Sequence, residues 1–164
     1  MNKFILLLLF IFQLPAIAKP LNVTLVIPAI LPQPFWSQLA GISKKAASDL
    51  NINLTVIGIK KDTTAHMARL EQIKWITKQN NKPDYVVFMP QTDTALQSFN
   101  LLEQKKIKFV TFGRTHVDYA HLALGRPREK YKYWIGESFY NNEQAGRLLA
   151  DYLITKAKDS KKKI

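Results

Sequence analysis

The feature that most constrains the fold of this chain is a regular alternation of two kinds of segment. Runs rich in β-branched and other apolar residues indicate buried strands of a parallel sheet. Between them lie segments whose apolar residues recur every three or four positions, as in an amphipathic helix. The expected strands are residues 21–27, 53–59, 85–89, 107–112 and 133–136. This order predicts an α/β fold with a doubly wound, mostly parallel sheet in three α/β/α layers, because right-handed crossovers place helices on both faces.

Four helices are expected, each with one apolar stripe facing the sheet. The first spans residues 35–50 and has the stripe Phe35, Leu39, Ile42 and Ala46. The second has Met67, Leu70, Ile73 and Ile76, and the third has Leu96, Phe99 and Leu102, with Thr92 or Asp93 as its cap. The fourth begins after Asn141, and its buried stripe is expected to be Ala145, Leu148, Leu149 and Tyr152. Residues 113–132 have no clear period and indicate a long loop.

Residues 1–18 have the pattern of a signal peptide. Lys3 precedes an apolar run over residues 4–14, and Ala16-Ile17-Ala18 gives a small-x-small cleavage pattern. The run is too short for a resident membrane helix. We therefore expect cleavage after Ala18 and export to the periplasm, with an uncleaved N-terminal anchor as the alternative.

The mature chain is expected to form one domain over residues 19–154, followed by a disordered, lysine-rich tail over residues 155–164. The chain has no cysteine, so its core alone must hold it together. Of the net charge of +12, the tail supplies +4, from five lysines and Asp159. Export and the absence of a base-reading motif argue against nucleic acid. The positive body favours an anionic ligand or envelope surface, or is an ordinary solvated surface.

Ligands in open α/β sheets bind beyond the carboxyl ends of the strands. The loops there are residues 28–34, 60–64, 90–93, 113 onward and 137–141. Phe35 and Trp36 diverge by about 100° around a helix axis, so one ring is expected in the cleft, where it could stack on a sugar ring. The alternative is that the two are simply core and surface. The candidate ligand-binding residues are Gln33, Phe35, Trp36, Gln91, Arg114 and Asn141.

Catalytic motifs are absent from the sequence, so no enzyme activity and no cofactor are expected. It has no cysteine nucleophile, no G-x-S-x-G turn and no G-x-x-x-x-G-K phosphate loop. His116 and His121, with Asp118 between them, could be imagined as metal ligands, but the spacing fits no strong motif. We expect a solvated loop there and no metal.

Five motifs occur in one order along residues 21–156. They are Pro34-Phe35-Trp36 with Gly41 and Ala46-Ala47, then Lys82–Pro90 (KPDYVVFMP), Ile107–Phe112 (IKFVTF), Trp134–Gly136 (WIG) and Asn141–Gly146 (NNEQAG). In this order and spacing they resemble the type I periplasmic sugar-binding proteins. The resemblance implies a periplasmic-binding-protein-like lobe that binds a sugar-like solute for an ABC importer. The alternative is a sensing lobe that docks on a membrane histidine kinase or receptor. A lac-repressor-type regulator is disfavoured, because a signal peptide stands where a helix-turn-helix would be.

The resemblance implies ligand contacts from Gln33, Phe35, Trp36 and Arg114. Ribose-type members carry Asp-Arg where this chain has Gly113-Arg114, so a carboxylate that accepts sugar hydroxyls is missing. Members are about twice as long, which implies that this sequence is an N-terminal lobe alone, either a fragment or the product of a truncated gene. A lone lobe has half a cleft, so weak solute binding is expected. Its exposed apolar and basic rim is expected to favour association with another chain.

Overall fold

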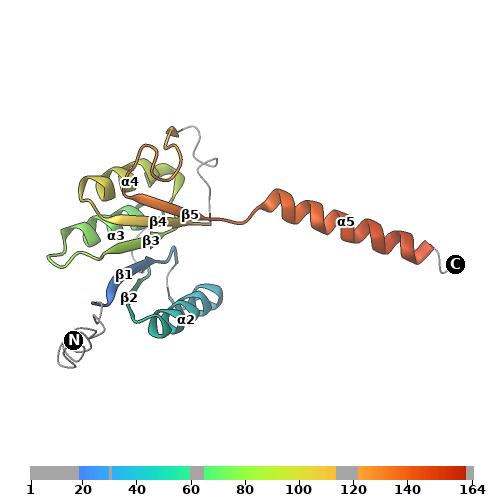
Figure 1. The fold of residues 1–164 in the computed structure, drawn as a ribbon, viewed down its shortest axis with the longest axis horizontal. Helices are drawn as coiled ribbons and strands as arrows, with labels where there is room; N and C mark the ends of the chain where they lie inside the picture. The colour runs from blue at the N-terminus through green and yellow to red at the C-terminus, as the bar shows by residue number, and fades with distance from the viewer. Residues whose placement is uncertain (1–18, 30, 60–64, 114–121, 162–164) are drawn as a thin grey trace, which may run out of the picture.

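A computed structural model describes residues 19–29, 31–59, 65–113 and 122–161 of the chain (Figure 1). The expected signal peptide, the loop after the second strand and the candidate Arg114 lie outside these residues, as do His116 and His121.

One parallel sheet of five strands organises the described chain (Figure 1). Its strands are β1 (Leu21–Val26), β2 (Ile52–Ile57), β3 (Tyr85–Phe88), β4 (Lys108–Phe112) and β5 (Trp134–Ser138). The spatial order is β2-β1-β3-β4-β5, and every neighbouring pair is parallel. The strands lie within two residues of their expected bounds, and the predicted α/β class is confirmed.

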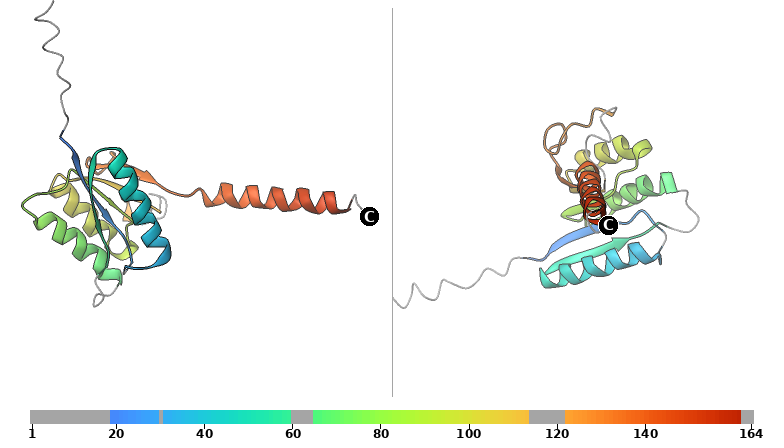
Figure 2. Two further views of the ribbon diagram at one scale, coloured as in Figure 1. Left: turned by 90° about the horizontal axis from the view of Figure 1, so that it is seen from below. Right: turned by 90° about the vertical axis from the view of Figure 1, so that its right-hand side faces the viewer.

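The main core lies on the face of the sheet covered by α3 (Ala65–Lys78) and α4 (Ala95–Gln104), which follows the short helix η1 (Thr92–Thr94) (Figure 2). The α3 stripe is buried as expected at Leu70, Ile73 and Ile76. On α4, Phe99 and Leu102 are fully buried, whereas Leu96 is 37% exposed. The expected cap was wrong: Thr94 is the N-cap of α4, and it makes no side-chain capping hydrogen bond.

Residues 122–133 contribute to this core, although the sequence indicated only a loop. Leu124 is fully buried, and Tyr131 is 3% exposed. The Tyr131 hydroxyl donates to Asn100 Oδ1 at 2.9 Å. The Glu103 carboxylate accepts the backbone N–H groups of Lys132 at 3.0 Å and Tyr133 at 2.9 Å. These bonds tie the segment to α4 without a periodic helix or strand, which is why no sequence period marked it.

Helix α2 (Pro34–Asp49) covers the opposite face beside β1 and β2 (Figure 2). Its inner face differs from the expected stripe: Ala40 and Ala47 are buried, whereas Phe35 is 60% and Ile42 is 70% exposed. Trp36 packs against the core on this side. The physical reason is that the small side chains of Ala40 and Ala47 let the helix lie close to the sheet, so Phe35 and Ile42 turn outward.

Helix α5 (Asn142–Lys161) projects away from the rest of the chain (Figures 1 and 2). The expected capping by Asn141 is confirmed, because its Oδ1 accepts the Gln144 backbone N–H at 2.9 Å. The expectation of a buried stripe was wrong, because every residue from Asn141 to Lys158 is exposed. Residues 155–161 are helical rather than disordered. None of the helices in the described ranges has the length and hydropathy that crossing a membrane requires.

Candidate functional site

A groove lies between α2 and the uncovered part of the sheet. Right-handed crossovers carry α3, α4 and residues 122–133 across the same face, which leaves α2 to cover β1 and β2 on the other. Strand order reverses between β1 and β3, the position at which open α/β sheets bind ligands. The groove runs along the face of the sheet, and one end of it lies near this position.

The walls of this groove, called the α2 groove below, are mostly apolar. Its floor is Leu25, Val87, Val110 and Phe112 from three adjacent strands, and its wall is Trp36, Leu39 and Ser43 from α2. The cavity volume is about 570 Å³, within the ~300–1,000 Å³ usual for small-molecule sites. The α2 groove is large enough for a molecule with one or two rings.

Four aromatic residues lie at the end of the groove nearest the carboxyl ends of the strands. Phe35 and Trp36 contact each other edge to face, with ring centroids 4.9 Å apart. Phe139 and Tyr140, which follow β5, are 47% and 76% exposed and also line the groove. Both rings of the expected pair therefore line the groove, with Trp36 packed inward and Phe35 largely exposed. Sequence reasoning singled out the first pair and missed the second, although it lies in the expected loop 137–141.

Gly113, at the end of β4, has a structural role. Gly113 has a φ of +78°, and its N–H donates to the Ser138 carbonyl at 2.8 Å. A Cβ at this position would lie 2.8 Å from Met89 Sδ. Both the left-handed backbone and the close sulfur oppose any side chain here. Residue 113 therefore favours glycine over any residue with a side chain, a carboxylate included.

The polar candidates that the structure describes, Gln33, Gln91 and Asn141, do not line the α2 groove. Gln33 is the exposed N-cap of α2 and makes no side-chain capping bond. Asn141 caps α5 as described above, and Gln91 accepts a hydrogen bond from the Arg69 guanidinium. Arg69 is buried and also donates to the Pro90 carbonyl at 3.5 Å, so it holds the turn after β3. Sequence reasoning missed Arg69, because one arginine within a helical pattern gives no signal of burial.

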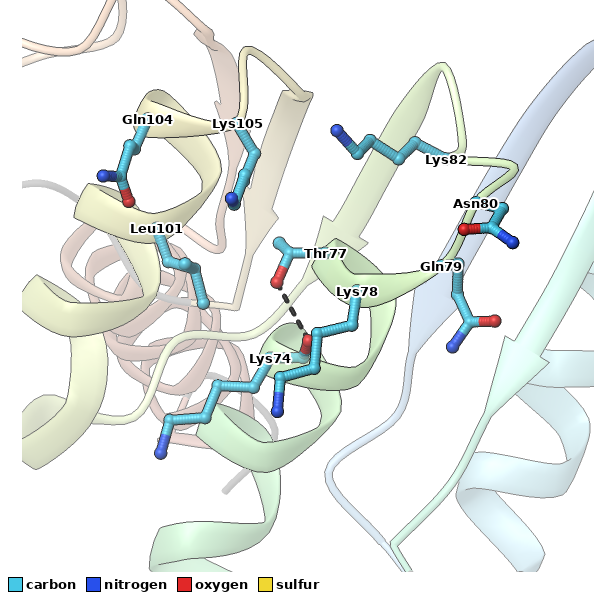
Figure 3. Close-up of a pocket in the computed structure, with 9 residues that line it drawn as sticks. All are labelled: Lys74, Thr77, Lys78, Gln79, Asn80, Lys82, Leu101, Gln104 and Lys105. Atoms are coloured by element: carbon cyan, nitrogen blue, oxygen red, sulfur yellow. Dashed lines mark hydrogen bonds between the residues drawn. The ribbon is translucent and has the colours of Figure 1, made fainter.

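A second hollow, at the amino ends of the strands, is polar and basic (Figure 3). It lies between the C-terminal ends of α3 and α4, and Thr77 Oγ1 donates to the Lys74 carbonyl there at 2.9 Å. Cations are favourable at helix C-termini, which suits Lys78 in the last turn of α3 and Lys105 at the C-cap of α4. The lysines that line the hollow are Lys74, Lys78, Lys82 and Lys105. In the described ranges, no three histidine, aspartate or glutamate side chains group as metal ligands would. The α2 groove is therefore the better candidate for the functional site.

Comparison with known proteins gives structural neighbours only. No protein-family model matches the chain, and neither does any curated protein sequence. A periplasmic sugar-binding protein from Pseudomonas fluorescens superposes with a TM-score of 0.60 and 23% identity over 79% of this chain. An ABC transporter periplasmic solute-binding protein from Actinobacillus succinogenes 130z, solved with bound D-allose, gives 0.53 and 16% over 64%.

The chain spans about a third of each neighbour, 35% of the first and 36% of the second. Both neighbours are described as binding proteins. At these identities the likeness establishes the fold, which agrees with the resemblance seen in the sequence motifs. The described residues thus have the fold of part of a periplasmic sugar-binding protein.

Proposed function

We propose that this chain binds a carbohydrate-like solute outside the cytoplasm and presents it to an ABC-type permease. The observation that carries the proposal is the α2 groove, with the aromatic rings of Phe35, Trp36, Phe139 and Tyr140 at its open end. Aromatic faces pack well against the C–H faces of sugar rings. The likeness of the fold to two solute-binding proteins also supports the proposal that this chain binds a solute.

The chemistry of the groove narrows the solute class. Among the described side chains that line the groove, those of Ser43, Ser138, Tyr140 and Trp36 carry a polar group. A groove with so few hydrogen-bonding groups favours a ring with a broad apolar face, such as a deoxy or aryl-substituted sugar, over a small free pentose. Arg114 and Gln91, which follow the ends of β4 and β3 in the sequence, are proposed to bind the polar side of the solute.

Tryptophan fluorescence would test binding, because Trp36 lines the groove. A Trp75→Phe background removes the exposed indole on α3, which is 54% exposed and lies outside the groove. Deoxy sugars, aryl glycosides and free sugars would be titrated into this variant. We expect a saturable change in emission with at least one class.

Two further variants on α2 give a matched comparison. Phe35→Ala removes a groove ring, and Ile42→Ala removes a similarly exposed side chain that is not part of the groove. The response should weaken at least tenfold in the first and persist in the second, with unchanged circular dichroism in both. No response to any sugar, or equal affinities in the two variants, would contradict the proposed function.

Export is a separate part of the proposal, and it rests on residues 1–18. Mass spectrometry of protein from the periplasmic fraction should give a mature chain that begins at Lys19. Intact Met1 on protein confined to the cytoplasm would contradict it.

A further inference from the structure

A third hollow lies on the α3 side of the sheet, at the amino ends of β1 and β2. Its volume is about 710 Å³, within the ~300–1,000 Å³ usual for small-molecule sites. One wall is the C-terminal half of α3 with the turn that follows it, and the floor is the face of β1 and β2. It shares no lining residue with the α2 groove, which lies on the opposite face of the sheet. This hollow, lined by Trp75, Asn22, Asn53 and Asp84 among others, is called the Trp75 hollow below.

The floor of the Trp75 hollow is polar, which is unusual for a parallel sheet. Strands of such sheets are normally apolar on both faces, because helices cover both. Here Asn22 and Thr24 of β1 lie in register with Asn53 and Thr55 of β2. Asn53 and Thr55 are exposed, and β2 is the edge strand of the sheet. Four side chains that can form hydrogen bonds thus make one patch at the edge of the sheet.

Hydrogen bonds hold three of the polar groups in a row across the strands. Asn53 Nδ2 donates to Asn22 Oδ1 at 3.1 Å, and the Asn22 backbone N–H donates to Asp84 Oδ2 at 2.8 Å. The Asp84 backbone N–H donates in turn to the Asn22 carbonyl at 2.8 Å. Among the described residues, none donates a hydrogen bond to Asn53 Oδ1 or to Asp84 Oδ1. The row is therefore fixed in place and keeps two acceptors for the hydroxyl groups of a ligand.

A large aromatic ring stands beside this polar row. Trp75 lies on the side of α3 toward β2, since Gln72, one turn earlier, donates to the Gly58 carbonyl just after β2 at 2.6 Å. The Trp75 side chain is 54% exposed, although that of its neighbour Ile76 is buried. Gln79, one turn later, donates to the Trp75 carbonyl at 3.1 Å and also lines the hollow (Figure 3). An exposed indole beside fixed amide and carboxylate groups suits a sugar ring, whose C–H face packs on the indole while its hydroxyls bond to the polar groups.

We propose that the Trp75 hollow binds a neutral saccharide, independently of the α2 groove. The charged side chains that line it are few and of both signs, Lys19 and Lys82 against Asp84. An anionic ligand would lie close to the Asp84 carboxylate, whereas a hydroxyl can donate to it. The amides of asparagine and glutamine both donate and accept, as hydroxyl groups do. The chemistry of the hollow therefore favours a hydroxyl-rich, uncharged ligand.

Nuclear magnetic resonance of the isotope-labelled full chain would test the proposal. The indole N–H signals report on three separate places, because Trp36 lines the α2 groove, Trp75 lines the hollow and Trp134 is in the core. Trp75→Phe identifies the Trp75 signal by its loss. Glucose, N-acetylglucosamine and cellobiose would be titrated separately. We expect a saturable shift of the Trp75 signal with at least one of them, and no shift of the Trp134 signal. If none of them shifts the Trp75 signal, the proposal is wrong.

Variants of the hollow would then be compared by isothermal titration calorimetry, in a Phe35→Ala background that impairs the α2 groove. Trp75→Ala should weaken binding at least tenfold, because the aromatic surface is lost. Tyr152→Ala is the matched control, since it removes a ring that is 59% exposed on α5 and lies outside the hollow, and it should leave the affinity unchanged. Equal affinities of these two variants would overturn the proposal.

Thr55→Val is a second variant that preserves the shape of the side chain. It replaces an exposed hydroxyl of the edge strand by a methyl group, and it should weaken binding about threefold to tenfold. Circular dichroism should be the same for Thr55→Val, Trp75→Ala and the parent chain. Full affinity in Thr55→Val would contradict the polar floor as part of the site.

Two further outcomes separate this inference from the proposed function. A shift of the Trp75 signal that persists in Phe35→Ala supports the hollow whether or not the α2 groove binds a solute. A shift of the Trp36 signal alone would support the proposed function and overturn the inference. A response to inorganic phosphate, but to none of the saccharides, would mean an anion site held by the lysines and would overturn the saccharide as the ligand.

Discussion

Gly113 and Met89 approach so closely that a Cβ on Gly113 would lie 2.8 Å from Met89 Sδ. The glycine also has a φ of +78°, a backbone conformation that residues other than glycine rarely adopt. Gly113→Ala should lower the free energy of unfolding by about 1–3 kcal/mol from strain and contact together. Urea unfolding would measure this loss.

A double variant separates the two causes of that loss. Met89→Ala removes the sulfur, so Gly113→Ala should cost less in the Met89→Ala background than in the parent chain. Backbone strain should account for the remainder. Identical costs in both backgrounds would show that the close contact contributes nothing.

The second prediction concerns the face of α2 that packs on the sheet, which differs from the face expected from the sequence. Ala47 is 6% exposed against the sheet side, whereas Ile42 is 70% exposed. Ala47→Leu should destabilise the chain by about 1–3 kcal/mol through overpacking. Ile42→Ala should change stability by no more than about 0.5 kcal/mol. If Ile42→Ala were the costlier change, the inner face expected from the sequence would be right after all.

The sequence was enough to predict the five strands, because each contains a short stretch of apolar, β-branched or aromatic residues between helical or turn segments. The α2 stripe was misplaced because hydropathy gives most weight to large residues. Close packing on a sheet instead selected Ala40 and Ala47. The exposure of α5 could not be predicted, since an amphipathic pattern indicates an apolar side but not what covers it.

The candidate site was predictable only in part. The aromatic pair Phe35 and Trp36 was found, because the carboxyl ends of parallel strands are known ligand positions. The groove itself was not, because it depends on which face of β3 and β4 no helix covers, a property of the assembled sheet. Phe139 and Tyr140 gain their role only from that arrangement.

Trp134 gives a third prediction, on the main core. Its indole Nε1 donates to Thr111 Oγ1 at 3.1 Å and to the Gly136 carbonyl at 3.0 Å, and the side chain is 1% exposed. Trp134→Phe should cost about 1–3 kcal/mol, from lost volume and from two unpaired acceptors. Thermal or urea unfolding would measure it. Trp75→Phe, at a 54% exposed position, is the control and should be near neutral.

The last prediction concerns alkaline stability and Tyr131. Burial, followed by the nearby Glu103 carboxylate, raises the pKa of the Tyr131 hydroxyl above its ordinary value of about 10. The unfolded chain therefore loses this proton first as pH rises, and it binds fewer protons than the folded chain in that range. The free energy of unfolding should fall from about pH 10 upward until the folded pKa is passed.

Tyr131→Phe removes the ionisable group and tests the assignment. Near neutral pH it should cost about 1 kcal/mol, because the hydroxyl's bond to Asn100 is lost. Above pH 10 the stability of the variant should fall less steeply than that of the parent, so the two curves converge. Urea unfolding at about pH 8, and at intervals between about pH 9.5 and 11.5, would measure both curves. The upper range is centred near the ordinary tyrosine pKa of about 10. Parallel curves would mean that the pKa of Tyr131 is the same in the folded and unfolded states. Other groups would then cause the loss of stability at alkaline pH.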